Sequence, residues 1–315
     1  MPSRMFFSSG DLMADRRFEF ARDLQLKGDL PAAADLVLQA IELAPDFTSA
    51  WFMLGEIREE LGDNELAVAA YRKATASDPD DRQGAGLRLM RLGAAPLSGM
   101  PHAYVQALFD QYARRFEVAL VDDLLYRGPE LLFGAVLSVR AAARKPAFFK
   151  RAIDLGCGTG LAATAFARGV DEFVGVDLSP RMIERARAGG LYARLEVADM
   201  LDFLRTQPDA SVDLVLAADA MVYVADLAPV FGEAARVLMP GGLLAFTTET
   251  HRGDGVIIGE GLRYAHATAC VRAAVAGAGL ALSLLEDRSA RNEDGVPVPG
   301  LVAVAAKTAP STNPS

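Results

Sequence analysis

Cysteine is nearly absent from this sequence, which holds two among its 315 residues. Cys157 and Cys270 lie in separate predicted elements, and neither has a C-x-x-C partner. This pattern argues against a disulfide framework and against a structural zinc site, and it fits a reducing compartment. We therefore expect a cytoplasmic protein.

Long apolar runs are also missing. The chain has no run of about 18 apolar residues, the length that a membrane-spanning helix needs. Met1–Gly10 lacks the charged start and long apolar stretch of a signal peptide. We expect no contact with a membrane and no secretion signal.

Basic residues are fewer than acidic ones. The chain has 32 Lys and Arg residues and 41 Asp and Glu residues, so its formal net charge is −9. This balance argues against a general nucleic-acid binder. Apolar residues, in contrast, make up 51% of the chain. Length and composition together predict two domains with a sizeable core.

The central feature is a glycine-rich turn. A short apolar strand, Ile153–Leu155, leads into Gly156, Gly158 and Gly160, and Leu161–Arg168 is predicted to be a helix. Glycine has no Cβ, so the backbone turns sharply and a ligand can approach it closely. Backbone amides at such a turn suit an anionic or hydrogen-bonding cofactor. The alternative is a tight strand-to-helix turn that binds nothing.

A carboxylate follows the next strand. Glu172–Val176 is a second apolar run, and it ends at Asp177, seventeen residues past Gly160. A carboxylate at such a strand end can accept hydrogen bonds from both hydroxyls of a ribose. Dinucleotide folds use the same device, so Asp177 alone does not select the cofactor.

The glycine spacing separates these cofactors. The dinucleotide fingerprint is G-x-G-x-x-G, whereas here Gly160 is followed by Leu161 and Ala162. Asp154, one apolar residue and G-x-G-x-G resemble the first motif of the class I S-adenosylmethionine-dependent methyltransferases. The resemblance implies S-adenosyl-L-methionine as the cofactor.

The resemblance also implies which residues meet that cofactor. Asp177 would hold the ribose hydroxyls, Asp199 and Met200 the adenine edge, and the glycine loop the methionine end. Ala218 and Asp219 would flank the sulfonium. The implied cofactor residues are Asp154, Gly156, Cys157, Gly158, Gly160, Asp177, Leu178, Asp199, Met200, Ala218 and Asp219, together with Tyr112. Asp199 alone has a simpler explanation as the cap of the following helix.

Strands and helices alternate after Arg151, which predicts a Rossmann-like, doubly wound α/β sheet. The last two strands, Leu280–Leu285 and Leu301–Ala305, are joined by Ser289–Pro299 and predict an antiparallel hairpin. Further strands are expected at Arg194–Val197, Asp213–Ala217 and Leu243–Thr247, a turn at Pro240–Gly242, and helices at Pro180–Ala188, Leu227–Leu238 and Ala265–Ala276.

Four acids, Asp154, Asp177, Asp199 and Asp219, fall at or near predicted strand ends. Such a set raises the question of a divalent metal. Metal ligands must converge within a few ångströms, and these acids follow different strands, so we expect no metal site.

Residues 14–81 contain an internal repeat. Gly28-Asp29 recurs as Gly62-Asp63, Ala33 as Ala67, Ala40 as Ala74 and Pro45 as Pro79, each offset by 34 residues. With Trp51, Leu54, Gly55 and Tyr71, the second copy resembles a tetratricopeptide repeat. The array predicts either a packing or homo-oligomerisation module or a groove for a protein partner.

A turn-rich stretch, Gly93–Pro101, separates the repeats from the following helices. Phe109, Tyr112 and Phe116 then fall on one helical face. With Leu125-Tyr126-Arg127, this segment resembles the lid of small-molecule methyltransferases fused to such repeats, in which the aromatic residues cover the cofactor and shape the substrate pocket. The alternative is an ordinary apolar stripe against the sheet. The predicted domains are repeats at 1–93, a linker at 94–101, a methyltransferase domain at 102–307 with a helical lid at 102–149, and a disordered tail at 308–315.

Methyl transfer requires that two reactants are aligned and water is excluded, and it requires a base only for a protonated acceptor. His266 is the leading candidate base and His251 a weaker one, while Tyr223 and Tyr264 are candidate substrate contacts together with Phe109 and Phe116. The leading hypothesis is a methyltransferase for an oxygen or nitrogen of a small molecule. The alternatives are a protein methyltransferase whose repeats dock the substrate, and a non-catalytic repeat scaffold.

Overall fold

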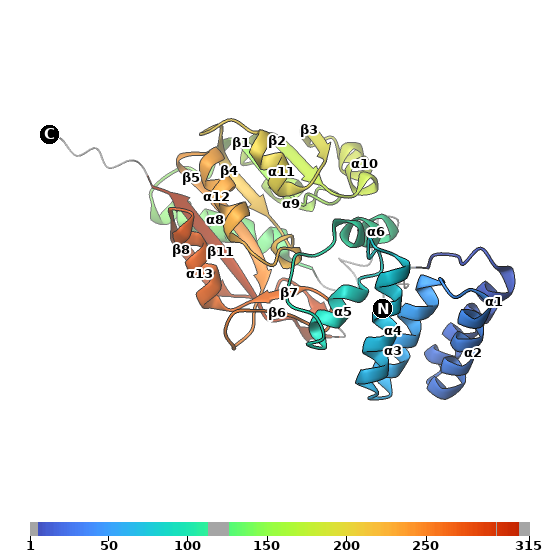
Figure 1. The fold of residues 1–315 in the computed structure, drawn as a ribbon. Helices are drawn as coiled ribbons and strands as arrows, with labels where there is room; N and C mark the ends of the chain where they lie inside the picture. Colours follow the sequence, from blue (N-terminus) through green and yellow to red (C-terminus); the bar gives the residue numbers. More distant parts are fainter. Residues whose placement is uncertain (1–5, 113–125, 294, 309–315) are drawn as a thin grey trace. The chain divides into compact units, whose positions relative to one another are not determined.

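The computed structural model describes residues 6–112, 126–293 and 295–308, so that all but the first residue of the predicted tail lie outside it. The chain divides into two compact units (Figure 1). The first comprises Met1–Leu108 with Ile258–Leu262, and the second comprises Phe109–Ile257 with Arg263–Ser315. The linker at 94–101 stays a prediction.

The first unit consists of paired helices. Both Gly28 and Gly62, at the turns that join the members of a pair, have φ of +82°, a conformation that favours glycine. Gly55 leaves room for Tyr71, since a Cβ there would overlap the Tyr71 ring. The repeating alanines Ala33, Ala40, Ala67 and Ala74 are buried. The helices are α1 (Leu12–Leu26), α2 (Leu30–Leu43), α3 (Thr48–Glu60), α4 (Asn64–Ser77) and α5 (Ala85–Arg91).

The second unit is built on one mixed sheet of order β3-β2-β1-β4-β5-β11-β8. The first five strands of this order are parallel neighbours, and β11 pairs antiparallel with both β5 and β8. The predicted doubly wound sheet with an antiparallel C-terminal hairpin is therefore confirmed. The strands are β1 (Phe149–Leu155), β2 (Val170–Asp177), β3 (Tyr192–Val197), β4 (Val212–Ala217), β5 (Leu238–Glu249), β8 (Leu280–Asp287) and β11 (Gly300–Lys307).

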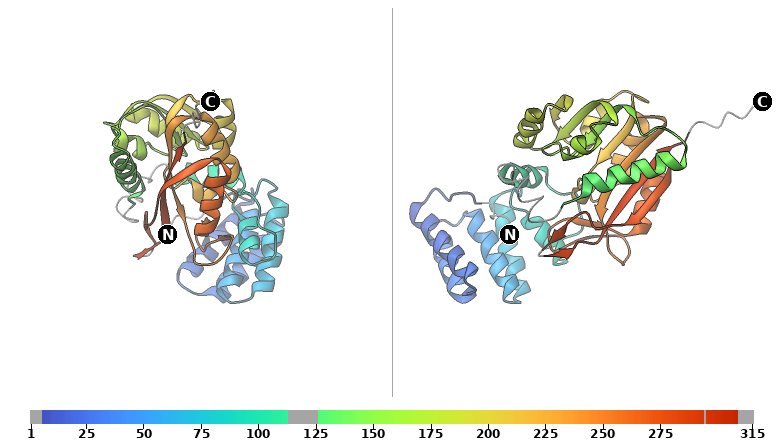
Figure 2. Two further views of the ribbon diagram at one scale, coloured as in Figure 1. Left: turned by 90° about the vertical axis from the view of Figure 1, so that its left-hand side faces the viewer. Right: turned by 180° about the vertical axis from the view of Figure 1, so that it is seen from behind.

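Alternating residues of the central strands enter two separate hydrophobic cores. In β4, Leu214 and Leu216 join one core, and Val215 and Ala217 join the other, because successive side chains of a strand point to opposite faces. The first core is covered by α8 (Gly128–Ala142), seen across the sheet in the right-hand view of Figure 2, and by α9 (Leu161–Phe166). The second is covered by α11 (Met200–Thr206), α12 (Ala228–Val237) and α13 (Thr268–Gly277).

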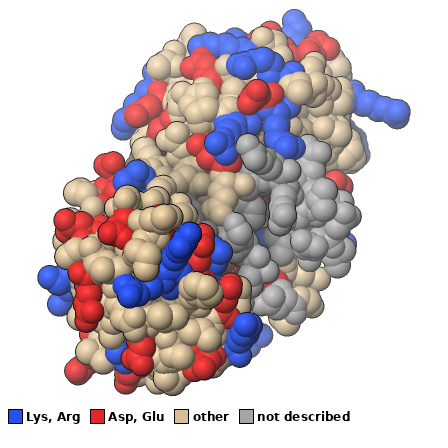
Figure 3. All heavy atoms as spheres, turned by 90° about the vertical axis from the view of Figure 1, so that its right-hand side faces the viewer, with Lys and Arg blue, Asp and Glu red and all other residues tan. Residues whose placement is uncertain are grey.

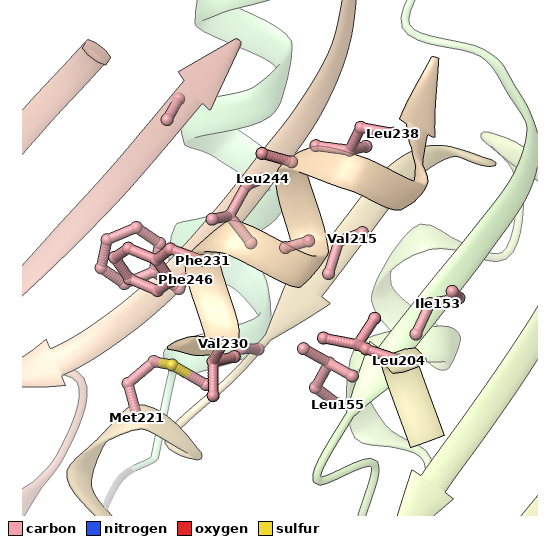
Figure 4. Packing of buried hydrophobic residues seen from close by; sticks show 14 of the residues in the cluster. Ile153, Leu155, Leu204, Val215, Met221, Val230, Phe231, Leu238, Leu244 and Phe246 are labelled. Carbon is pink, nitrogen blue, oxygen red and sulfur yellow. The ribbon is translucent and has the colours of Figure 1, made fainter. Parts of the chain in front are cut away.

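Figure 4 shows the second core from close by. Phe231 of α12 lies beside Phe246 of β5, with ring centroids 4.6 Å apart.

On the other face of the sheet, α8 contributes Leu132 and Val136 to the first core, and both side chains are buried. The helical lid over 102–149 stays a prediction.

Two local predictions are wrong. Pro240–Gly242 lies within the continuous strand β5, where the register shifts opposite Val212 and Leu214, instead of forming a turn before the strand. The helix expected from Ala265 begins at Thr268, because Tyr264–His266 forms the short strand β7 beside β5. The Ser289–Pro299 connection contains a small antiparallel pair, β9 (Asn292–Glu293) and β10 (Val296–Pro297).

The remaining described elements are α6 (His102–Tyr112), α10 (Pro180–Gly189), the 3-10 helix η2 (Met221–Tyr223) and β6 (Val256–Ile258). None of the helices in the described ranges has the length and apolar character that a bilayer crossing requires. Acidic and basic side chains are interspersed over the face shown in Figure 3.

Candidate cofactor and substrate site

The glycine loop after β1 depends on its glycines. Gly156, Gly158 and Gly160 have φ of +65°, +53° and +98°, all in the left-handed region. A Cβ on Gly156 would lie 2.8 Å from the Cβ of Ala220, so this glycine also has no room for a side chain. The loop is thus held against the residues that follow β4.

Asp177 closes the loop from the neighbouring strand. Its Oδ2 accepts a hydrogen bond from the Gly158 amide at 2.9 Å, and its Oδ1 accepts one from the Ser179 amide at 2.8 Å. Burial raises the pKa of Asp177 to about 6, with the charge of Asp110 adding to the rise and the two amides opposing it. At neutral pH the side chain is therefore a carboxylate with capacity to accept further hydrogen bonds.

Asp154, at the end of β1, is 1% exposed. Its Oδ2 accepts a hydrogen bond from the hydroxyl of Tyr192 at 2.6 Å, and its Oδ1 has no partner among the described residues. Burial raises the pKa of Asp154 to about 7. Tyr192 is not among the residues predicted from the sequence, although the isolated Gly175 within β2 signals a close approach. A Cβ on Gly175 would lie 2.8 Å from the Tyr192 ring.

Asp199 caps α11, because its Oδ1 accepts hydrogen bonds from the amides of Leu201 at 2.9 Å and Asp202 at 3.0 Å. Asp199 Oδ1 therefore serves as the helix cap that the sequence offered as the simpler explanation. Met200 is the first residue of α11, and Leu178 directly follows Asp177. Both residues, like Ala218 after β4, are half-buried at the carboxyl edge of the sheet.

A network of charged side chains, with the buried Arg291 at its centre, lies beyond β4. Asp219 has φ of +56°, and its amide donates to Thr247 Oγ1 at 2.8 Å. Arg291, 3% exposed, donates from Nη1 to both carboxylate oxygens of Asp219 at 3.0 and 3.3 Å. Its Nη2 donates to Glu249 and Glu293. We call Asp219, Glu249, Arg263, Arg291 and Glu293 the charged cluster. Of these five residues, only Asp219 is predicted from the sequence as a site residue.

Aromatic side chains adjoin the charged cluster. The rings of Phe109 and Tyr223 meet edge to face at 5.3 Å between centroids, which brings two of the predicted substrate residues together. The Tyr223 hydroxyl accepts a hydrogen bond from Arg263 Nε at 3.1 Å. Burial raises the pKa of Tyr126, and the charges of Asp219 and Asp154 raise it further.

The other predicted substrate residues are less informative. Tyr264 in β7 is fully buried, and burial raises its pKa to about 12. Tyr112 is the last residue of α6, and its side chain lies outside the description. Phe116 lies outside the described residues altogether.

His266 is enclosed on both sides of its ring. Its Nδ1 lies 2.9 Å from Thr248 Oγ1 and its Nε2 lies 3.0 Å from the carbonyl of Val224. The carbonyl accepts only, so the assigned tautomer carries its proton on Nε2 and accepts the Thr248 hydroxyl at Nδ1. Burial lowers the pKa of His266, and the ring is 1% exposed. His251 bonds within its own loop, to Gly253 and Gly255.

The observed geometry fits a nucleoside-bearing, cationic cofactor. Asp177 and the glycine loop offer hydrogen-bonding groups, and the unpartnered oxygen of Asp154 lies at the end of β1. Among the described residues, no group of three or more His, Cys, Asp or Glu is arranged to hold a metal ion.

Comparison with known proteins identifies the family. The model of the methyltransferase domain matches residues 153–246, and a tetratricopeptide-repeat model matches residues 18–82. The chain is 33% identical to human methyltransferase-like protein 27 over 174 residues, which cover 55% of this chain and 69% of that protein. The chain belongs to the class I S-adenosylmethionine-dependent methyltransferases. Its cofactor, fused repeats and enzyme class are as predicted.

This methyltransferase has further relatives. It is 33% identical over 128 residues to the ubiquinone biosynthesis O-methyltransferase of Xylella fastidiosa (strain 9a5c), a match that covers 38% of this chain and only about half, 52%, of that protein. Its fold is shared with the 1,6-didemethyltoxoflavin-N1-methyltransferase of Burkholderia thailandensis, with a TM-score of 0.50, 17% identity, and coverage of 68% of this chain and 93% of that chain.

Proposed function

We propose that this methyltransferase methylates an oxygen or nitrogen of a small-molecule acceptor. The observation that carries the proposal is the contact of Phe109 with Tyr223 beside the charged cluster, since rings and buried polar groups together suit a compact ligand. Relatives support it, because the Xylella fastidiosa protein is an O-methyltransferase of ubiquinone biosynthesis and another match, 37% identical over 102 residues, is the 27-O-demethylrifamycin SV methyltransferase of Amycolatopsis mediterranei.

The cofactor contacts are assigned by the same proposal. The carboxylate of Asp177 accepts hydrogen bonds from the ribose hydroxyls. The Asp199–Met200 turn contacts the adenine edge. Asp154 presents its unpartnered Oδ1 to the methionine end, while the Tyr192 hydroxyl fixes its other oxygen. Gly156 and Gly160 allow the loop backbone to approach closely.

The bound cofactor supplies an electrophilic methyl group on a sulfonium. The protein then has to orient the acceptor and exclude water. Phe109 and Tyr223 cover the acceptor. Ala220 lies against Gly156, which holds the residues after β4 against the glycine loop. Asp110 joins the end of α6 to this site, because it accepts a hydrogen bond from Ser179 Oγ at 2.5 Å.

His266 is not required as a base in this proposal. Its Nδ1 lone pair accepts the Thr248 hydroxyl, so it is not available to an acceptor proton. We assign His266 to ordering β7 against η2, through Thr248 on one side and Val224 on the other. An acceptor that is already deprotonated at neutral pH needs no base.

The proposal is tested by labelling. Cell extract is separated into small-molecule and protein fractions, and each is incubated with the purified protein and isotopically labelled S-adenosylmethionine. Label in a small molecule supports the proposal, and label confined to proteins overturns it in favour of the protein methyltransferase. Gly156→Ala is the control, because its added Cβ would disturb the loop and abolish labelling in both fractions.

A further inference from the structure

Two arginines, the buried Arg291 and the half-buried Arg263, converge on one oxygen atom in the charged cluster. Glu293 Oε1 accepts hydrogen bonds from Arg263 Nη1 at 3.0 Å, Arg291 Nη2 at 3.0 Å and Arg291 Nε at 3.3 Å. The side chains of the arginines are 19% and 2% exposed, whereas that of Glu293 is 43% exposed. The two arginines are therefore paired with a carboxylate that is more exposed to solvent than either of them.

The other carboxylates of the cluster are held more firmly. Asp219 receives two hydrogen bonds from Arg291, and its backbone amide is bound to Thr247. Glu249 ends the central strand β5, and its side chain is 13% exposed. Glu293 lies on the two-residue strand β9, outside the main sheet. Of these three acids, Glu293 loses least when it moves into water.

Arg263 and Arg291 both contact residues of the proposed methyl-transfer site. Arg291 binds Asp219, whose neighbour Ala220 lies against Gly156 of the cofactor loop. Arg263 binds the hydroxyl of Tyr223, and its guanidinium carbon lies 5.8 Å from the centre of that ring. A ligand anchored by the arginines thus has the Phe109–Tyr223 rings beside it.

We propose that Arg263 and Arg291 bind a carboxylate of the methyl acceptor, an aromatic acid, and that Glu293 occupies this position until the acceptor displaces it. The inference rests on the proposed small-molecule function. A planar guanidinium group can bind both oxygens of a carboxylate at once. In the part of the chain that the structure describes, the arginines bind Glu293 through its Oε1 alone. The exchange replaces one carboxylate by another, so the net charge of the charged cluster is unchanged.

The test uses benzoate as the probe and benzamide, its uncharged analogue, for comparison, with S-adenosylhomocysteine present. Calorimetry or ligand-observed NMR on the full chain should give benzoate an affinity about tenfold above that of benzamide. Glu293→Gln should tighten benzoate binding about fivefold, because the competing charge is removed. Arg263→Lys should weaken benzoate about tenfold and leave benzamide unchanged.

Arg288→Lys is the matched control, since Arg288 is exposed and pairs with Glu286 outside the cluster. Its thermal midpoint and benzoate affinity should both equal those of the parent protein. Equal binding of benzoate and benzamide, no benzoate binding, or no gain in Glu293→Gln would overturn the inference and leave the cluster as a structural network. Labelling of a neutral small molecule in the extract assay would then leave the proposed function standing.

Discussion

The Asp177 carboxylate and the Gly158 amide, nineteen positions apart in sequence, are joined by a hydrogen bond of 2.9 Å. This bond couples the second strand to the glycine loop, so the cofactor contacts assigned to the two segments depend on each other. The protonation state of Asp177 is therefore expected to control cofactor affinity.

Affinity for S-adenosylmethionine should fall as the pH decreases through about 6. Burial raises the pKa of Asp177 to about 6, and below that pH the protonated carboxyl accepts fewer hydrogen bonds. Asp177→Ala should lose about 2–4 kcal/mol of binding free energy at pH 8. Calorimetry at pH 5 and pH 8 checks both points, and a parent affinity that is the same at the two pH values would contradict the assignment.

Asp154→Asn should stabilise the empty protein at high pH. The folded-state pKa of about 7 exceeds the ordinary 3.8, so the parent loses stability as the pH rises from about 4 to about 7, and the loss stays constant above that. The variant avoids this loss, and its gain at pH 8 should be of order 4 kcal/mol.

The measurement is denaturant unfolding at pH 5 and pH 8, with the exposed Asp171→Asn as the control. A stability difference between Asp154→Asn and the parent that does not grow with pH would contradict the prediction. Cofactor affinity should decrease in the same variant, because the charge beside the methionine end is gone.

Gly156→Ala should abolish cofactor binding and destabilise the second unit by about 1–3 kcal/mol, since φ of +65° disfavours a side chain and the added Cβ meets Ala220. Gly189→Ala is the matched control, because nothing lies within 4 Å of a Cβ there. Thermal unfolding and calorimetry of the two variants check this, and unimpaired binding by Gly156→Ala would show that the loop is not tightly held.

Gly55→Ala should destabilise the repeat unit by about 1–3 kcal/mol, the cost of overpacking, because its Cβ would overlap the Tyr71 ring. Adding Tyr71→Leu should recover part of this loss, which a double-mutant cycle measures. Strict additivity of the two changes would mean that the steric explanation is incorrect.

His266→Gln separates a structural role from a catalytic one. The lowered pKa of His266 means that its contribution to stability is present above about pH 6.5, the ordinary value, and is lost as the pH falls. We expect about 1–2 kcal/mol of lost stability at pH 8 and a kcat within about tenfold of the parent. A general base would cost about 10²–10⁴-fold in kcat, so a drop of that size would restore His266 to catalysis.

The parallel half of the sheet could be predicted because its signals are local. Ile153–Leu155, the glycine spacing and Asp177 all lie within one strand–helix–strand segment. Tyr192 lies 38 residues from its partner Asp154, and Arg291 lies 72 residues from Asp219. Nothing in the residues around Arg291 indicates that they fold back onto β4, so the charged cluster required the structure.

His266 shows the opposite difficulty. A histidine near a predicted ligand edge favours catalysis, but the short strand β7 buries it between Thr248 and the Val224 carbonyl. Tyr264–His266 is too short for a periodic pattern, so the sequence predicted a helix start there. The turn predicted at Pro240–Gly242 is wrong for a related reason. The residues at a register shift inside a strand can have the same composition as a turn, and β5 has such a shift there.

The position of β11 has a consequence for biosynthesis. Among the described strands of the sheet β11 comes last in the chain, yet it lies inside the sheet, between β5 and β8. During translation, β8 therefore emerges from the ribosome with no neighbour to pair with, and the edge of β5 stays open until β11 follows. The repeats, whose contacts are local, fold while the sheet is still incomplete. A nascent chain stalled before Gly300 would display an unpaired strand edge, the kind of surface that chaperones bind.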